Sequence, residues 1–139
     1  MDKILTVGVF DYFHYGHLRL FNQIKSNYPK SYLIVAVQKK EFILKYKPGS
    51  IVFYSTEIRC DIIRSLRQVD KVITYDNVSD IVRYVDFSIF AIGEDQNHSG
   101  FQDAISYCIK NGKEILKLSR TPNISSTNVK GYFEFKSQE

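Results

Sequence analysis

Short apolar runs alternate along this chain with segments whose apolar residues recur at helical spacing. The run YLIVAV at residues 32–37 consists of β-branched, aromatic and other apolar residues without interruption. A continuous run of this kind is typical of a strand buried on both faces of a parallel sheet. The apolar runs that predict strands are residues 4–8, 32–37, 71–75, 86–93 and 113–118.

The segments between these runs predict helices or turns. We expect helices through residues 18–24, from Thr56 to about Arg67 with Ser55 as the cap, through 81–84, and from Gly100 to Asn111 with Gly112 as the stop. Residues 39–52 are basic and predict an irregular segment with a turn at Pro48 and Gly49.

Strands that alternate with helices over short connections predict a parallel sheet with helices on both faces. Right-handed crossovers make this a Rossmann-like, doubly wound α/β fold of about five strands. The chain has 139 residues, the size of one ordinary domain. We therefore expect residues 1–139 to form a single domain.

Composition and charge narrow the function classes. No apolar run is long enough to span a bilayer, and MDKILTVGVF lacks the pattern of a secretion signal, so we expect a cytoplasmic protein with no membrane partner. Cys60 and Cys108 lie far apart without metal-ligand spacing and indicate reduced core thiols. The net charge is +4, but no arginine-rich block is present. The chain therefore favours an anionic small substrate and no nucleic acid.

The loop after the first predicted strand carries the clearest chemistry. It lacks the glycine spacing of dinucleotide sites and P-loops, but it holds His14 and His17, three residues apart where a helix begins. There the two imidazoles share one face of the first turn with backbone N–H groups that attract anions, and Gly16 lets a ligand approach closely. A histidine pair at this spacing also occurs as a surface pair or a metal site, but the strand–loop–helix context favours phosphate binding.

Two segments resemble the signatures of a known family. GVFDYFHYGH, residues 8–17, is similar to the signature of the cytidylyltransferase-like nucleotidyltransferases, and RTPNISST, residues 120–127, is similar to the second signature of the glycerol-3-phosphate cytidylyltransferases. The lysine-bearing loop, YSTEIR, LRQVDKV and GEDQ follow in the same order, so the resemblance covers nearly the whole chain. Pro122 and Asn123 depart from the pattern, as does Ser126 in place of threonine, which bears on the choice of substrate.

The resemblance implies an enzyme. The implied reaction transfers a cytidylyl group from CTP to an alcohol phosphate and releases pyrophosphate. The expected acceptor is glycerol 3-phosphate, and the product is then CDP-glycerol. This product would be used in teichoic-acid or capsule synthesis. It also implies Mg²⁺ bound with CTP and a homodimer. The alternatives are another acceptor (phosphocholine, phosphoethanolamine or another polyol phosphate), an adenylyltransferase of the same fold, a nucleotide-binding module without catalysis, and a nucleic-acid-binding domain.

The resemblance further implies roles for single residues. The residues implied to be catalytic are His14, His17, Lys45 and Arg120. The residues implied to bind the nucleotide are Gly8, Val9, Phe10, Asp11, Gly16, Lys47, Asp95, Thr121, Ile124, Ser125, Ser126 and Thr127, with Asp11 also a metal ligand. The acceptor is expected at Arg59, Arg67 and His98.

Several of these residues have a structural alternative. Lys45 and Lys47 could instead be solvent-exposed loop residues, and Asp95 could be part of a polar turn at a strand end. Arg59 and Arg67, eight apart on one predicted helix, fit surface salt bridges. His98 fits a loop or helix-capping position.

Overall fold

The computed structural model describes residues 1–119, and the predictions that fall on residues 120–139 lie outside that part. The elements are β1 Lys3–Gly8, α1 Tyr15–Asn27, β2 Tyr32–Gln38, α2 Lys40–Tyr46, α3 Thr56–Arg64, β3 Lys71–Tyr75, α4 Val78–Tyr84, β4 Ile89–Gly93, α5 Ser99–Lys110 and β5 Glu114–Leu118. Each predicted strand is present within a few residues of its expected bounds.

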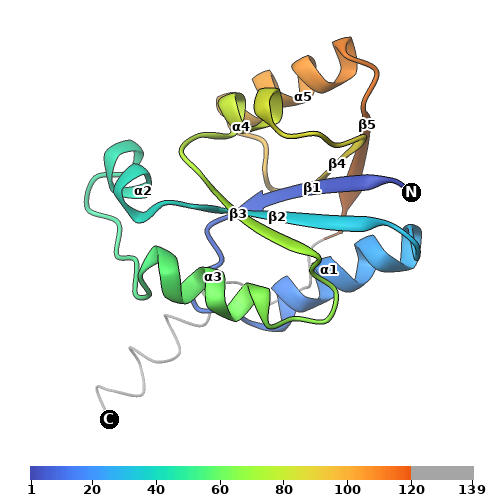
Figure 1. Ribbon diagram of the computed structural model, residues 1–139. Helices are drawn as coiled ribbons and strands as arrows, with labels where there is room; N and C mark the ends of the chain where they lie inside the picture. Colours follow the sequence, from blue (N-terminus) through green and yellow to red (C-terminus); the bar gives the residue numbers. More distant parts are fainter. Residues whose placement is uncertain (120–139) are drawn as a thin grey trace.

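The strands form one parallel sheet in the order β3-β2-β1-β4-β5. Helices α4 and α5 cover one face, and α1 and α3 cover the other (Figure 1). The predicted Rossmann-like, doubly wound α/β fold is confirmed. The chain winds outward from β1 in both directions, so the order reverses between β1 and β4, where such sheets bind their ligands at the carboxyl edge.

The core has two layers because successive residues of a strand point to opposite faces. Leu5 and Val7 of β1 lie in the cluster that includes Val82 of α4 and Ala104 of α5. Ile4 lies in the other cluster, with Phe21 and other residues of α1 and α3. Both faces are covered, which explains why the strands are continuous apolar runs.

Helix α2 lies where the sequence predicts an irregular segment. Of the seven residues of this helix only Ile43 is buried, and a hydrogen bond to a residue distant in the sequence stabilises its start. The Lys40 N–H donates to Thr56 Oγ1 at 2.9 Å, which satisfies one of the unpaired donors at the helix start. A contact across 16 residues leaves no local pattern, so the helix could not be predicted from spacing.

Helix ends follow the predicted signals in two places and differ in one. The Ser55 side chain accepts from the Ile58 N–H at 3.2 Å, and Gly112 turns the chain after α5 with a φ of 73°. Helix α3 ends at Arg64, not near Arg67, because the chain turns there through contacts such as the Val69 N–H with the Leu66 carbonyl at 3.2 Å. Across residues 1–119, no helix combines the length and apolar character needed to cross a membrane.

Candidate active site

The loop after β1 enters the site through an unusual turn. Phe10 and Tyr12 have φ values of 55° and 50°, the left-handed region that non-glycine residues rarely adopt. The Phe10 ring folds back over β1, so that a Cβ on Gly8 would lie 2.8 Å from its Cζ. A side chain at residue 8 would therefore force the buried Phe10 ring to move. The positive φ values show that the loop has a strained conformation of the kind that clusters at functional sites.

His14 and His17 lie together at the start of α1. His14 is the N-cap: its Nδ1 accepts from the Gly16 N–H at 3.0 Å, while His17 Nδ1 accepts from the His14 N–H at 3.3 Å. The rings stack with centroids 3.9 Å apart. Because each Nδ1 is an acceptor, each neutral ring carries its proton on Nε2. The buried His14 Nε2 has no partner within residues 1–119, and is therefore available to donate to a ligand.

Burial keeps this pair uncharged. Desolvation lowers the pKa of His17 to about 3, with the nearby His14 a second cause, and burial also lowers the pKa of His14. At neutral pH the two rings are therefore neutral N–H donors.

The buried pair predicts a pH dependence of stability. In the unfolded chain the imidazoles take up protons as the pH falls through 6.5, but folded His17 stays neutral until about pH 3. The unfolded state thus binds more protons in this window, and the free energy of unfolding decreases as the pH falls, by up to about 1.4 kcal/mol per pH unit for each histidine. Urea unfolding at pH 7 and pH 5 measures this. The His14→Ala/His17→Ala variant is expected to lose less stability over the same interval, and an equal loss would contradict the interpretation.

Asp11 fixes the segment that faces the histidine loop. Its carboxylate accepts from the N–H groups of Phe53 at 2.6 Å and Tyr54 at 3.0 Å, and the residue is 4% exposed. The Tyr12 ring stacks on Phe53 with centroids 5.3 Å apart. The two loops are therefore joined through Asp11. Both carboxylate oxygens of Asp11 already accept hydrogen bonds from the backbone. Its roles in binding the nucleotide and a metal ion remain predictions.

Arg59 connects the same segments from inside the fold. The residue is fully buried, and its guanidinium donates to the carbonyls of Val9 at 2.9 Å, Gln38 at 2.8 Å and Tyr54 at 3.1 Å and to Thr56 Oγ1 at 3.2 Å. Burial lowers the pKa of Arg59, and the Asp11 carboxylate opposes that shift. The surface salt bridge considered from the sequence is therefore wrong. The bonds give Arg59 a positioning role, whereas acceptor binding remains a prediction.

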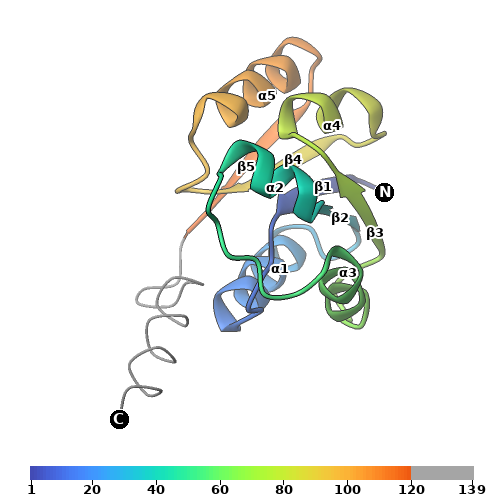
Figure 2. The ribbon, with the colours of Figure 1, turned by 90° about the vertical axis from the view of Figure 1, so that its left-hand side faces the viewer.

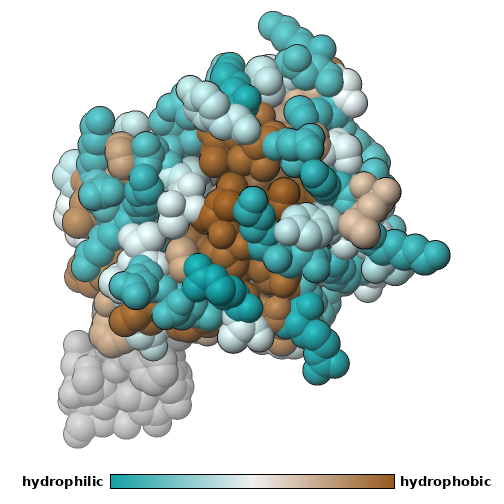
Figure 3. Space-filling view, in the orientation of Figure 1, coloured by the Kyte–Doolittle hydropathy of each residue, from teal (hydrophilic) through white to brown (hydrophobic). Residues whose placement is uncertain are grey.

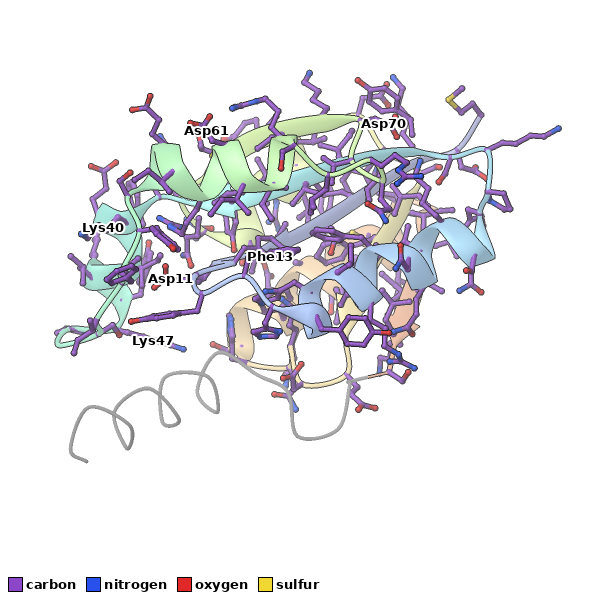
Figure 4. All side chains as sticks on the ribbon, turned by 90° about the horizontal axis from the view of Figure 1, so that it is seen from below. Asp11, Phe13, Lys40, Lys47, Asp61 and Asp70 are labelled. Atoms are coloured by element: carbon purple, nitrogen blue, oxygen red, sulfur yellow. The ribbon has the colours of Figure 1, made fainter. Side chains whose placement is uncertain are left out.

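The two predicted lysines lie on or beside α2. This helix sits in front of the carboxyl edge of the sheet, as Figure 2 shows. Lys45 is exposed, with its Nζ 5.6 Å from the centroid of the Tyr46 ring, and Lys47 is the C-cap of the helix. Asp11 and Lys47 lie at the same end of the molecule in Figure 4, far from Asp70. The structure thus brings the lysine-bearing helix to the edge that carries the histidines.

The turn after β4 completes this edge. Asp95 lies close above Gly93, where an added Cβ would be 3.1 Å from its Oδ1. His98 caps α5, since its Nδ1 accepts from the Gly100 N–H at 3.1 Å. The capping alternative is confirmed, and contact of Asp95 or His98 with a substrate remains a prediction.

Arg67 does not join this site within one chain. It lies after α3, in the turn before β3, where it lines a shallow groove with Lys25 and Gln68. That turn is at the amino edge of the sheet, opposite the histidines. The prediction that Arg59 and Arg67 share a helix is wrong, because α3 ends at Arg64.

Sequence reasoning named Arg59 only as an acceptor-binding residue and missed its buried positioning role, and it missed Gln96 altogether. Arg59 sits four residues before the buried Ile63, so its place on the inner face of α3 was a usable signal for a buried role. Gln96 bridges β1 and β4 through its side chain, and no local pattern marks it. The predicted residues Arg120, Thr121, Ile124, Ser125, Ser126 and Thr127 lie outside the described part of the chain.

The fold and the site together define a Rossmann-like α/β protein with a histidine pair at the carboxyl edge of its sheet. Comparison with known proteins makes this specific: the family model described as Cytidylyltransferase-like matches residues 5–131. A glycerol-3-phosphate cytidylyltransferase of Bacillus spizizenii is 36% identical over 134 residues, which cover 94% of this chain and 95% of that protein. A choline-phosphate cytidylyltransferase A of Mus musculus is 30% identical, over 91% of this chain and 35% of that protein.

Solved structures agree on the fold. A lipopolysaccharide core biosynthesis protein from Thermoplasma volcanium superposes with a TM-score of 0.69 at 23% identity, covering 87% of this chain and 97% of that one. The chain belongs to the cytidylyltransferase-like family, and it is a nucleotidyltransferase.

Proposed function

We propose that this nucleotidyltransferase transfers the cytidylyl group of CTP to glycerol 3-phosphate, giving CDP-glycerol and pyrophosphate. The observation that carries the proposal is the neutral His14–His17 pair at the start of a helix beside the switch point, in which the buried His14 Nε2 has no partner within residues 1–119. The choice of CTP and glycerol 3-phosphate is supported by the similarity to the Bacillus spizizenii enzyme along 94% of the chain. A cytoplasmic location and a role in teichoic-acid or capsule synthesis belong to the same proposal.

This reaction requires that the acceptor phosphate is aligned with the α-phosphorus and that the charge developing on the phosphate oxygens is stabilised. An oxygen of the acceptor phosphate attacks the α-phosphorus of CTP, one oxygen–phosphorus bond forms, and the bond to the pyrophosphate oxygen breaks in line with it. The attacking phosphate is already ionised, so no strong base is required. The two Nε2–H groups donate to oxygens of the α- and β-phosphates, where charge develops. The N-terminus of α1 and the α2 lysines add positive potential.

We propose that Mg²⁺ enters with CTP and neutralises phosphate charge. Both oxygens of Asp11 accept backbone hydrogen bonds, and residues 1–119 hold no cluster of three or more His, Cys, Asp or Glu residues that could bind a metal ion. Such a chain fits a cation held mainly by substrate phosphates and water, which is how Mg²⁺ often binds. The protein's own contribution is then the histidine pair and the lysines.

We also propose a homodimer. Strand β3 is an edge of the sheet in the part of the chain that the structure describes. Figure 3 shows apolar side chains gathered in the middle of the face where β3 crosses in front of the sheet in Figure 1. Light scattering is expected to give twice the chain mass of 16.2 kDa.

Pyrophosphate release in the presence of Mg²⁺ tests the substrates. CTP and ATP are supplied separately, each with glycerol 3-phosphate, phosphocholine, phosphoethanolamine and a second polyol phosphate. Turnover that needs CTP and glycerol 3-phosphate supports the proposal. Turnover with CTP and phosphocholine alone would favour the activity named for the Mus musculus relative, and turnover with ATP alone would make the chain an adenylyltransferase.

Lys47→Ala is expected to raise the KM for CTP by about tenfold or more, because an amino group that pairs with a phosphate contributes roughly 1.5–3 kcal/mol. Steady-state kinetics at saturating acceptor measures this. Lys110→Ala is the control, since Lys110 is exposed at the end of α5, at the opposite edge of the sheet. Equal effects of the two substitutions would show that Lys47 does not bind CTP.

A further inference from the structure

The neighbouring strands β1 and β4 separate before they end. β1 pairs with β4 only from Ile4–Ile89 to Thr6–Ala91. On their other sides, β1 stays paired with β2 through Gly8, and β4 stays paired with β5 through Gly93. The separation therefore lies only between β1 and β4, at the carboxyl edge where the strand order reverses.

One side chain occupies this separation. The Gly93 N–H donates to Gln96 Oε1 at 2.9 Å, and Gln96 Nε2 donates to the Val7 carbonyl at 3.0 Å. If the parallel ladder continued by one step, the Gly93 N–H would donate directly to that same Val7 carbonyl. The amide of Gln96 thus replaces the next bond between the strands and satisfies both backbone groups.

The backbone fixes this side chain in place. The Gln96 N–H donates to the Gly93 carbonyl at 3.1 Å, which closes a tight turn at the end of β4. Gln96 is half-buried, whereas its neighbours Asp95 and Asn97 are exposed. The amide has one orientation that satisfies both partners, because only Oε1 accepts and only Nε2 donates.

We propose that Gln96 is a positioning residue that holds β1 and β4 apart so that the nucleoside part of the nucleotide enters between the histidine loop and the turn at residues 94–95. The inference rests on the proposed function for the identity of the ligand. With alanine at this position the strands close toward each other and the entrance narrows. Binding of the nucleotide then weakens, while the histidine pair that acts on the bound phosphates is unchanged.

Kinetics separates this role from a general loss of structure. Gln96→Ala is expected to raise the KM for CTP about tenfold with kcat within about twofold of the parent. Gln96→Met keeps the length of the side chain, so it should raise the KM less. Gln68→Ala is the matched control, because Gln68 lies at the amino edge and, within the described part of the chain, its amide donates to Asn22 Oδ1. An unchanged KM in Gln96→Ala, a fall in kcat alone, or equal effects of Ala and Met would overturn the proposal.

A second measurement does not depend on turnover. In the ¹⁵N,¹³C-labelled parent, scalar coupling across the hydrogen bond should connect the Gly93 nitrogen to the side-chain amide carbon of Gln96. Coupling to the Val7 carbonyl carbon, or none to Gln96, would overturn the role of Gln96 as a spacer. A parent that shows this coupling but turns over no nucleotide would instead count against the proposed function.

Discussion

Alanine in place of His17 is expected to lower kcat by about 10²- to 10³-fold, equivalent to roughly 2.7–4 kcal/mol of lost transition-state stabilisation. His17 presents a neutral Nε2–H because its Nδ1 accepts from the backbone of His14 and because burial lowers its pKa to about 3. A donor fixed in this way needs no reorganisation as charge develops on the phosphate oxygens. Its contribution is therefore larger in the transition state than in the ground state, so the effect falls on kcat.

The measurement is steady-state pyrophosphate release, with urea unfolding of each variant to separate activity from folding. Tyr15→Ala is the control: Tyr15 lies in the same turn, between the two histidines, and is 58% exposed. It should stay within about twofold of the parent. A folded His17→Ala variant with more than about a tenth of parental kcat would remove His17 from the mechanism.

Arg59→Met is expected to cost about 3–5 kcal/mol of unfolding free energy, the range found when one partner of a buried charge network is removed. The substitution leaves the carbonyls of Val9, Gln38 and Tyr54 without their donor. It also leaves the buried Asp11 without the nearby positive charge. Because methionine fills a similar volume, the loss comes from unsatisfied polar groups more than from a cavity.

Urea unfolding at neutral pH measures this cost. Arg64→Met is the matched control on the same helix, since Arg64 is exposed and, among residues 1–119, its ion pair is with Asp61 three residues away. Exposed pairs contribute little, so we expect a change below about 1 kcal/mol. A loss as small in Arg59→Met as in Arg64→Met would show that Arg59 does not hold the loops together.

Local signals account for most of the fold. The strands can be predicted from the sequence because a parallel sheet covered on both faces buries the middle of an inner strand on both sides, as in β2, where residues 33–37 are all buried. The Ser55 cap and the Gly112 stop act on their nearest neighbours, so they are visible in sequence. Helix α2 was missed because the side chain that accepts a hydrogen bond from its first residue is Thr56, which lies across a loop.

The site likewise contains residues that the sequence predicts from local contacts and residues whose contacts are distant in the chain. His14 and His17 hydrogen-bond within their own turn, so their spacing alone predicts a shared face. Arg59 and Gln96 act between segments far apart in the chain, with Gln96 reaching Val7 across 89 positions. Only the folded chain shows these contacts. The position predicted for Arg67 is wrong because turn contacts end α3 at Arg64. The residues after Arg64 therefore do not continue along the helix face on which Arg59 lies.

The central claim is transfer of a cytidylyl group by the histidine pair. ³¹P NMR of the protein with CTP, Mg²⁺ and glycerol 3-phosphate tests it most directly, because substrates and products are seen together. We predict that the glycerol 3-phosphate resonance is replaced by the two coupled phosphorus resonances of CDP-glycerol as pyrophosphate appears, and that His14→Ala and His17→Ala are slower by two orders of magnitude or more. Unchanged CTP and glycerol 3-phosphate with the folded parent protein would contradict this reaction.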